Sequence, residues 1–271
     1  MVFIPAGSFM MGHATNVLPF GEGGADELPQ HEVFVDALYV DKYEFPSGLW
    51  NTLETWDFQN GFVYVFSNRY SYGPDNHPRR SVNWYDALKM CNLRSEHEGL
   101  TPVYYIDVSF TNIYRSGEIM PYVNWAANGY RLPTEAEWEK AARGGMPDLR
   151  YPWSDTTNEF SYAKANANGH PAFCPGPSCN PSPVGYFPSN DYGLYDMGGN
   201  VMEWCWDVYD ASYYSNSPTS NPRGPASGPG RVMRGGDYAY ESPRISARVA
   251  IFPSLENYDY FFVGFRCVRK P

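Results

Sequence analysis

Two stretches of the chain repeat apolar residues at helical spacing. The first has apolar residues at positions i, i+3, i+4 and i+7: Trp84, Ala87, Leu88 and Cys91. This spacing places one apolar stripe on a single helix face, which packs against a core. Ser81 or Asn83 can cap the first turn, and Gly99 can supply the left-handed exit. The pattern therefore predicts a helix that starts near residue 84 and ends near Glu98.

The second helical stretch carries its own start signal. Thr134 precedes Glu137 by three residues, so the hydroxyl can accept from the Glu137 amide while the Glu137 carboxylate accepts from the Thr134 amide. Gly144 follows as a left-handed exit. We expect a helix between these residues, with one buried face made of Trp138, Ala141 and Ala142.

Shorter apolar runs between turns predict β-strands at residues 31–36, 38–41, 231–234 and 263–268. We expect the last two strands to pair, so that residues 237–263 form a loop system on a sheet. Residues 213–230 are rich in Ser, Asn, Pro and Gly, a composition typical of a surface loop.

The composition favours an irregular α+β domain with two main helices, short strands and many loops. Aromatic residues make up 17% of the chain, which also holds 25 glycines and 24 prolines. That mixture argues against a helical bundle. No repeat of fixed period and no second core is evident, so we expect a single domain over residues 1–271.

The formal net charge of −10 excludes a nucleic-acid partner, because such binding depends on clustered Lys and Arg. No apolar run of 18 residues predicts a membrane span. The first residues lack the basic and apolar regions of a signal peptide. The protein is therefore secreted or surface-displayed if a leader has been removed, and cytoplasmic otherwise.

The five cysteines do not form a disulfide framework. Cys91, Cys205 and Cys267 lie among apolar or aromatic neighbours, which is typical of buried thiols. Pro and Gly residues bend the chain between Cys174 and Cys179, which form either a local disulfide or two free thiols. A structural zinc site would need more soft ligands than this region offers.

Residues 237–263 stand out from the rest of the chain. They include seven aromatic residues but no Cys, His, Lys or Met. Tyrosine provides a large contact area at low entropic cost, so binding loops favour it. Packing of these aromatic side chains in a core is the alternative. Four arginines lie in or beside the segment, and they either satisfy carbonyls and carboxylates or grip an anionic ligand: Arg234, Arg244, Arg248 and Arg266. For Arg234 and Arg266 we favour the structural role.

Several blocks occur in a recognisable order: residues 2–12, 41–44, 81–88, 131–138, 193–204, 231–236 and 264–269. Together they resemble the formylglycine-generating enzyme (sulfatase-modifying factor) superfamily over essentially the whole chain. The resemblance implies that family's variant of the C-type lectin fold. It does not imply one activity, because fold and function are separable.

The resemblance makes the family's oxidase activity testable in the sequence. The copper-dependent oxidases of the family carry a cysteine pair shortly after the Arg-Gly-Gly block. Here residues 237–244 contain no cysteine, and none lies between Cys205 and Cys267. Because copper(I) selects thiolate ligands, we expect no copper site of that type. The five histidines are dispersed, which argues against an iron site of the family's other enzymes.

The superfamily also resembles the variable proteins of diversity-generating retroelements, whose C-terminal loops are displayed for binding. We therefore expect a non-catalytic ligand-binding or display protein, with a protein or other extracellular ligand as its partner. An oxidase that works without the cysteine pair is the alternative. The candidate ligand-binding residues are Asp237, Tyr238, Tyr240, Phe252, Asn257, Tyr258, Tyr260 and Phe261.

The resemblance further implies a structural calcium site at Asn200 and Glu203, since calcium prefers amide, carboxylate and carbonyl oxygens. Asn166 marks the start of a second, weaker candidate site. In the alternative interpretation, Asn200 is a turn residue bonded to nearby backbone, and Glu203 pairs with an arginine.

Overall fold

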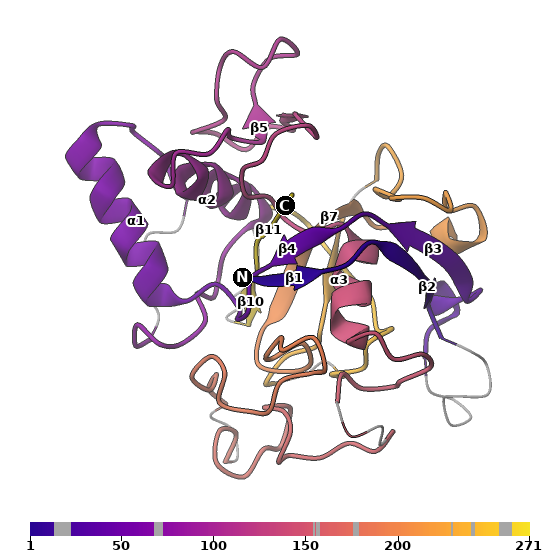
Figure 1. Ribbon diagram of the computed structural model, residues 1–271. Coiled ribbons are helices and arrows are strands. Elements are labelled where there is room, and N and C mark those ends of the chain that lie inside the picture. Colours follow the sequence, from indigo (N-terminus) through magenta and orange to yellow (C-terminus); the bar gives the residue numbers. More distant parts are fainter. Residues whose placement is uncertain are drawn as a thin grey trace.

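The structure is a computed structural model that describes residues 1–13, 23–67, 73–153, 155, 158–175, 179–228, 230–239, 242–254 and 262–271. Within these residues the helices are α1 (Ser47–Asn60), α2 (Trp84–His97) and α3 (Glu135–Arg143), with short 3-10 turns η1 (Ala25–Glu27) and η2 (Tyr213–Ser215). The fold is α+β, as expected, and Figure 1 shows long loops between the elements. None of these helices has both the length and the apolar character needed to cross a bilayer.

The cap residues explain where α2 and α3 begin. The Asn83 side chain accepts from the Asp86 amide at 2.7 Å, so Asn83 rather than Ser81 caps α2. Thr134 and Glu137 form the predicted capping box at α3, and Gly144 ends this helix in the left-handed conformation. Both predicted helices are confirmed.

Helix α1 was not predicted from the sequence. Its N-cap residue is Pro46, which offers no side-chain hydrogen bond, and the buried positions form a narrow face. Phe58 points outward and is 89% exposed. The usual start signal and amphipathic pattern are therefore both weak in this helix.

Within the described residues, short strands form four small sheets. The strands are β1 (Val2–Ile4), β2 (Gly7–Met11), β3 (His31–Val35), β4 (Leu38–Val40), β5 (Tyr104–Tyr105), β6 (Tyr122–Val123), β7 (Met202–Val208), β8 (Arg231–Arg234), β9 (Val249–Ile251), β10 (Val263–Gly264) and β11 (Val268–Arg269). The sheet orders are β1-β4-β11, β10-β7-β8-β9, β2-β3 and β5-β6.

The expected pairing of residues 231–234 with residues 263–268 is wrong. Strand β7, which is buried along its whole length, lies between β8 and β10. It pairs antiparallel with β8 and parallel with β10. The predicted strand at 263–268 is also divided, because β11 leaves this sheet and pairs with β4. The two blocks that flank residues 237–263 therefore belong to one sheet without being neighbours.

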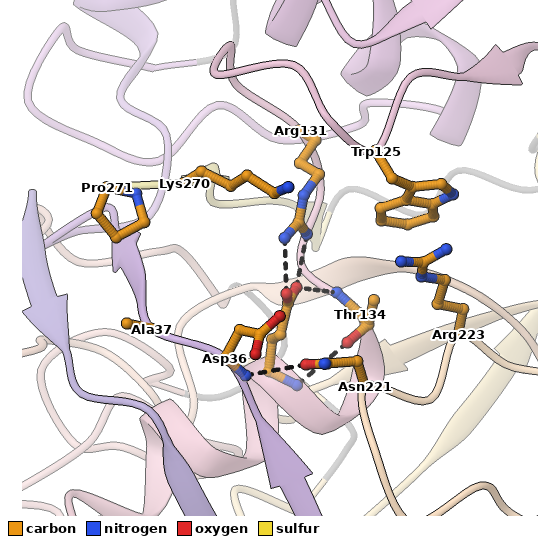
Figure 2. Close-up of a pocket in the computed structure, with 10 residues that line it drawn as sticks. Asp36, Ala37, Trp125, Arg131, Thr134, Asn221, Arg223, Lys270 and Pro271 are labelled. Carbon is orange, nitrogen blue, oxygen red and sulfur yellow. Dashed lines mark hydrogen bonds and ion pairs between the residues drawn. The ribbon is translucent and has the colours of Figure 1, made fainter.

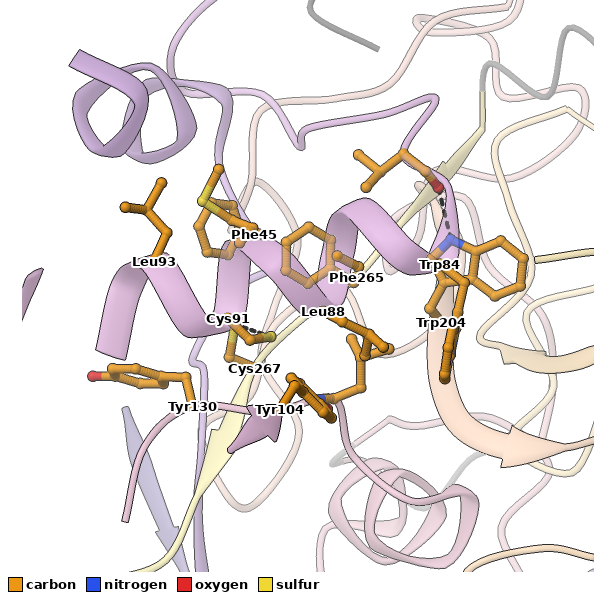
Figure 3. Packing of buried hydrophobic residues seen from close by; sticks show 14 of the residues in the cluster. Phe45, Trp84, Leu88, Cys91, Leu93, Tyr104, Tyr130, Trp204, Phe265 and Cys267 are labelled. Carbon is orange, nitrogen blue, oxygen red and sulfur yellow. Dashed lines mark hydrogen bonds between the residues drawn. The ribbon is translucent and has the colours of Figure 1, made fainter. Parts of the chain in front are cut away.

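Two large apolar clusters fill most of the interior of the described part of the chain, beside a small third one made of Tyr151, Trp153 and Ala165. Figure 3 shows the first, where α2 packs against the ends of β7 and β10. The indole N–H of Trp84 donates to the Cys205 carbonyl at 2.9 Å, and that of Trp204 donates to the Val82 carbonyl at 2.7 Å. The second cluster joins α3 to β1, β3 and β4 (Figure 1). The indoles of Trp84 and Trp204 therefore keep a hydrogen bond despite their burial.

Candidate functional site

Arg234, at the end of β8, connects the beginning of residues 237–263 to α3. Its side chain is fully buried and forms an ion pair with Glu139. The Nη1 group donates to the carbonyl oxygens of Ser246 and Ala247, both at 2.7 Å. Gly235 and Gly236 follow with φ angles of 93° and 69°, a conformation that favours glycine. Arg234 therefore fixes the turn that starts the segment.

Arg266 holds the other end of the segment. Its Nε and Nη2 groups donate to Glu203 at 2.7 and 2.6 Å, a bidentate geometry. The same guanidinium donates to the carbonyl oxygens of Asp41 at 3.2 Å and Tyr195 at 3.0 Å. Since Arg266 is fully buried, the pair connects β7 with the stretch after β10. The structural role favoured for Arg234 and Arg266 agrees with these contacts.

Arg244 and Arg248 lie inside the segment, and both are also paired. Arg244 donates to both carboxylate oxygens of Glu27 at 2.8 Å. Arg248 donates to both oxygens of Glu135 at 2.6 and 2.9 Å. Burial by itself raises the pKa of Glu27, but hydrogen bonds led by that from Arg244 outweigh it and lower the pKa to about 2. These two arginines act as anchors to η1 and α3 rather than as free anion binders.

Two of the candidate ligand-binding residues lie below the surface. Asp237 is fully buried and accepts from the Ala239 amide at 2.5 Å. Tyr238 is 3% exposed, and its hydroxyl accepts from Arg80 at 3.0 Å. The expectation that Asp237 and Tyr238 form an exposed contact surface disagrees with this burial, which for Tyr238 reflects a contact 158 positions away in the chain.

Among the three candidates that the structure describes, Phe252 is the exposed one. It follows β9, which forms one edge of its sheet in the described part of the chain, and it is 66% exposed. The Trp84 amide donates to the Pro253 carbonyl at 2.9 Å, so the backbone next to Phe252 is held against α2. The remaining candidates lie outside the described residues: Tyr240, Asn257, Tyr258, Tyr260 and Phe261.

All five cysteines lie in the described part of the chain. Cys174 and Cys179 form a disulfide, which decides between the two alternatives for this pair. Cys91, Cys205 and Cys267 are buried free thiols, as predicted. Burial raises the pKa of Cys205 and of Cys267, which disfavours their thiolate forms. The chain thus presents no accessible thiol beside residues 237–263.

The calcium candidates can be compared with the donors that calcium requires. Both carboxylate oxygens of Glu203 accept hydrogen bonds, from Arg266 and from the Trp138 indole at 2.8 Å. The Asn200 side chain accepts from the Ser182 amide at 2.9 Å and donates to Glu44 at 2.6 Å. These contacts fit the turn-and-ion-pair alternative for Asn200 and Glu203, and the calcium site stays a prediction from the family resemblance.

Asn166 differs from these two residues. It is fully buried, its Nδ2 group donates to the Asn180 carbonyl at 2.9 Å, and its Oδ1 atom has no hydrogen-bond partner. One open amide oxygen falls well short of the six to eight oxygen ligands that calcium takes. Among the described residues, no three His, Cys, Asp or Glu side chains converge as a metal-ligand group.

A pocket of about 400 Å³ lies outside this segment and was not anticipated from the sequence. It is formed beside the start of α3, and Trp125 and Arg223 belong to its lining (Figure 2). Arg223 falls within residues 213–230, which the composition marked only as a surface loop. A lone arginine between prolines gives no sequence signal of a site.

The family model of the sulfatase-modifying factor enzyme 1-like domain matches residues 1–271. The chain belongs to this family. The formylglycine-generating enzyme of Streptomyces coelicolor is 37% identical over 165 residues, which cover 55% of this chain and 48% of that enzyme. The chain thus spans about half the length of that relative. The formylglycine-generating enzyme of Mus musculus is 32% identical over 300 residues, covering 98% of the chain and 74% of the enzyme.

A solved structure with a similar fold is Treponema denticola variable protein 1. It superposes with a TM-score of 0.79 at 27% sequence identity, covering 100% of this chain and 95% of that chain. The chain therefore shares one fold with formylglycine-generating enzymes and with a variable protein, as the resemblance in the sequence implied.

Proposed function

We propose that this chain is a non-catalytic binding protein, and that residues 237–263 form its ligand-contacting surface on a C-type-lectin-like scaffold. The observation that carries the proposal is the complete pairing of the four arginines in and around the segment. Arg234, Arg244, Arg248 and Arg266 are all bonded to carboxylates or carbonyls elsewhere in the fold. Side chains that point outward from the segment are therefore not needed for folding.

Phe252 is the side chain that best fits a contact role. A large aromatic group that is 66% exposed provides the area that binding hot spots use. The backbone hydrogen bond between Trp84 and Pro253 holds the backbone next to Phe252 in place, so little backbone entropy is lost when a ligand binds. On sequence grounds we assign the same role to Tyr240, Asn257, Tyr258, Tyr260 and Phe261. The ligand that suits such a surface is a protein.

The Treponema denticola protein with the similar fold is, by its name, a variable protein. We extend this property to the present chain and propose that residues 237–263 differ between copies of its gene. Within the segment, Arg244 and Arg248 would stay constant, because they anchor it to Glu27 and Glu135, and the variation would fall on residues that face outward, such as Phe252.

The genome tests this version directly. We expect a near-identical copy of the stretch that encodes residues 237–263 beside a reverse transcriptase gene, with differences at adenines of the copy. Sequencing of the gene neighbourhood decides the matter. A neighbourhood that has neither the copy nor the reverse transcriptase would refute variation by this mechanism.

An oxidase that acts without the cysteine pair is the second candidate, favoured by 32% identity to the Mus musculus enzyme over 98% of the chain. Copper(I) requires soft ligands, and the free thiols here are buried. We expect that the protein, incubated with copper(I) and a cysteine-containing sulfatase peptide, forms no formylglycine by mass spectrometry. The Streptomyces coelicolor enzyme serves as the positive control. Turnover by the present protein above a no-protein blank would overturn the non-catalytic assignment.

A further inference from the structure

The pocket beside α3 has a charge balance opposite to that of the whole chain. The protein carries 30 acidic and 20 Lys and Arg residues. Three basic and two acidic residues line the pocket: Arg131, Arg223, Lys270, Asp36 and Glu137. Arg131 and Glu137 neutralise each other through two hydrogen bonds of 2.6 Å. Among the other lining side chains, Arg223 and Lys270 are positive and Asp36 is negative, so the side-chain charge that remains is positive.

Arg223 is an exposed cation of this pocket, as is Lys270. Its guanidinium lies 4.0 Å from the ring centroid of Trp125, and Figure 2 shows the two side chains next to each other at the mouth. Among the described residues its guanidinium forms no ion pair. Burial and then the nearby positive charge of Arg131 lower the pKa of Arg223. An anion in the pocket would offset this repulsion between two like charges.

The loop that carries Arg223 is held in place. The Asn221 amide donates to the Phe34 carbonyl at 2.8 Å, and the Asn221 side-chain oxygen accepts from the Asp36 amide at 2.9 Å. Asn221 has a φ of 45°, so this turn uses a left-handed residue. Two contacts to the end of β3 therefore position the guanidinium before any ligand arrives.

Thr134, which lies close to Arg223 in Figure 2, supplies a further donor. Thr134 caps α3, and its oxygen accepts from the Glu137 amide at 3.3 Å, which leaves the hydroxyl proton for another acceptor. Figure 2 shows Thr134 and Asn221 on the same side of the pocket. The first turn of α3 contributes partial positive charge at this position.

We infer that this pocket binds the anionic oxygens of a small carboxylate or phosphate compound, with Arg223 as the main ligand-binding residue. The volume of about 400 Å³ falls within the range of small-molecule sites. The guanidinium fork matches carboxylate and phosphate geometry. The inference does not depend on the proposed function, because none of the described residues of 237–263 lines the pocket.

Isothermal titration calorimetry with citrate and with inorganic phosphate, at constant ionic strength, tests the inference. The test variant is Arg223→Gln. The matched control is Arg150→Gln, which removes the same charge from an arginine stacked over Tyr151 at 5.0 Å on another part of the surface. We expect Arg223→Gln to weaken binding about tenfold or more, since a charge-assisted bond is lost. Arg150→Gln should bind like the unchanged protein.

The two probes also distinguish the source of the anion. Binding of citrate alone identifies a carboxylate site, and binding of phosphate alone identifies a phosphate site. Absence of binding by both probes up to about 10 mM would overturn the inference. An equal loss of anion affinity in the two variants would also overturn the inference, because such a loss would reflect net charge rather than this pocket.

Discussion

The sharpest prediction compares Arg234, which anchors the start of residues 237–263, with Phe252, an exposed residue within them. Arg234→Met removes a fully buried guanidinium that bonds Glu139 and two carbonyl oxygens. Breaking a buried pair from one side costs about 3–5 kcal/mol, since the remaining partner stays buried without its counter-charge. Glu139 keeps Arg143 and the Gly12 amide, so we place the loss near the lower end.

Phe252→Ser should behave very differently. Complete burial of a phenylalanine stabilises by about 1.5–3 kcal/mol, and Phe252 is 66% exposed, so its loss should cost less than about 1 kcal/mol. Arg223→Met is a matched control for loss of an arginine from the surface and should also cost less than about 1 kcal/mol.

Urea unfolding followed by circular dichroism measures these differences, provided that the slope with denaturant is the same in all variants. In thermal unfolding, Arg234→Met should lower the melting temperature by roughly 10 °C. If the free energies of unfolding of Arg234→Met and Phe252→Ser lie within about 1 kcal/mol of each other, the division of this region into buried anchors and an exposed contact surface is refuted.

Three further predictions concern other pairs. Glu203→Gln should lower the free energy of unfolding equally in calcium buffer and in a chelator, because Arg266 and Trp138 are the partners of Glu203. A loss of stability confined to calcium buffer would support the calcium assignment. The pKa of Glu27 is about 2 in the fold against 4.5 unfolded, so its contribution of about 3 kcal/mol is present above pH 4.5 and lost toward pH 2. Stability should depend less on pH in this window for Glu27→Gln, and an unchanged profile would contradict the pairing. Replacing Cys174 and Cys179 by serine should cost about 2 kcal/mol through loss of loop closure, measured as a lower urea midpoint.

Local signals in the sequence were sufficient to locate α2 and α3. Their caps lie within three residues of the groups that they bond, so the sequence alone specifies these contacts. The start of α1 at Pro46 has no such bond, and its pattern is diluted by exposed Phe58. Prediction of this helix requires knowledge of the core against which Trp50 packs.

The interior of the candidate site depends on contacts between distant residues. Tyr238 is buried under Arg80, 158 positions away in the chain, and Arg244 reaches Glu27 across 217 positions. Neither pairing leaves a pattern in the neighbouring sequence. For the same reason the insertion of β7 between β8 and β10 could not be foreseen from the two blocks alone.

The anchors of residues 237–263 contact partners outside the segment, and this has a consequence for its evolution. Glu27 and Glu135 hold Arg244 and Arg248 from other parts of the chain. Phe252 has no anchoring role, so a new residue there needs no compensating change nearby. Successive substitutions at outward positions should thus be nearly independent of order, and many sequences can be reached one step at a time without an unfolded intermediate.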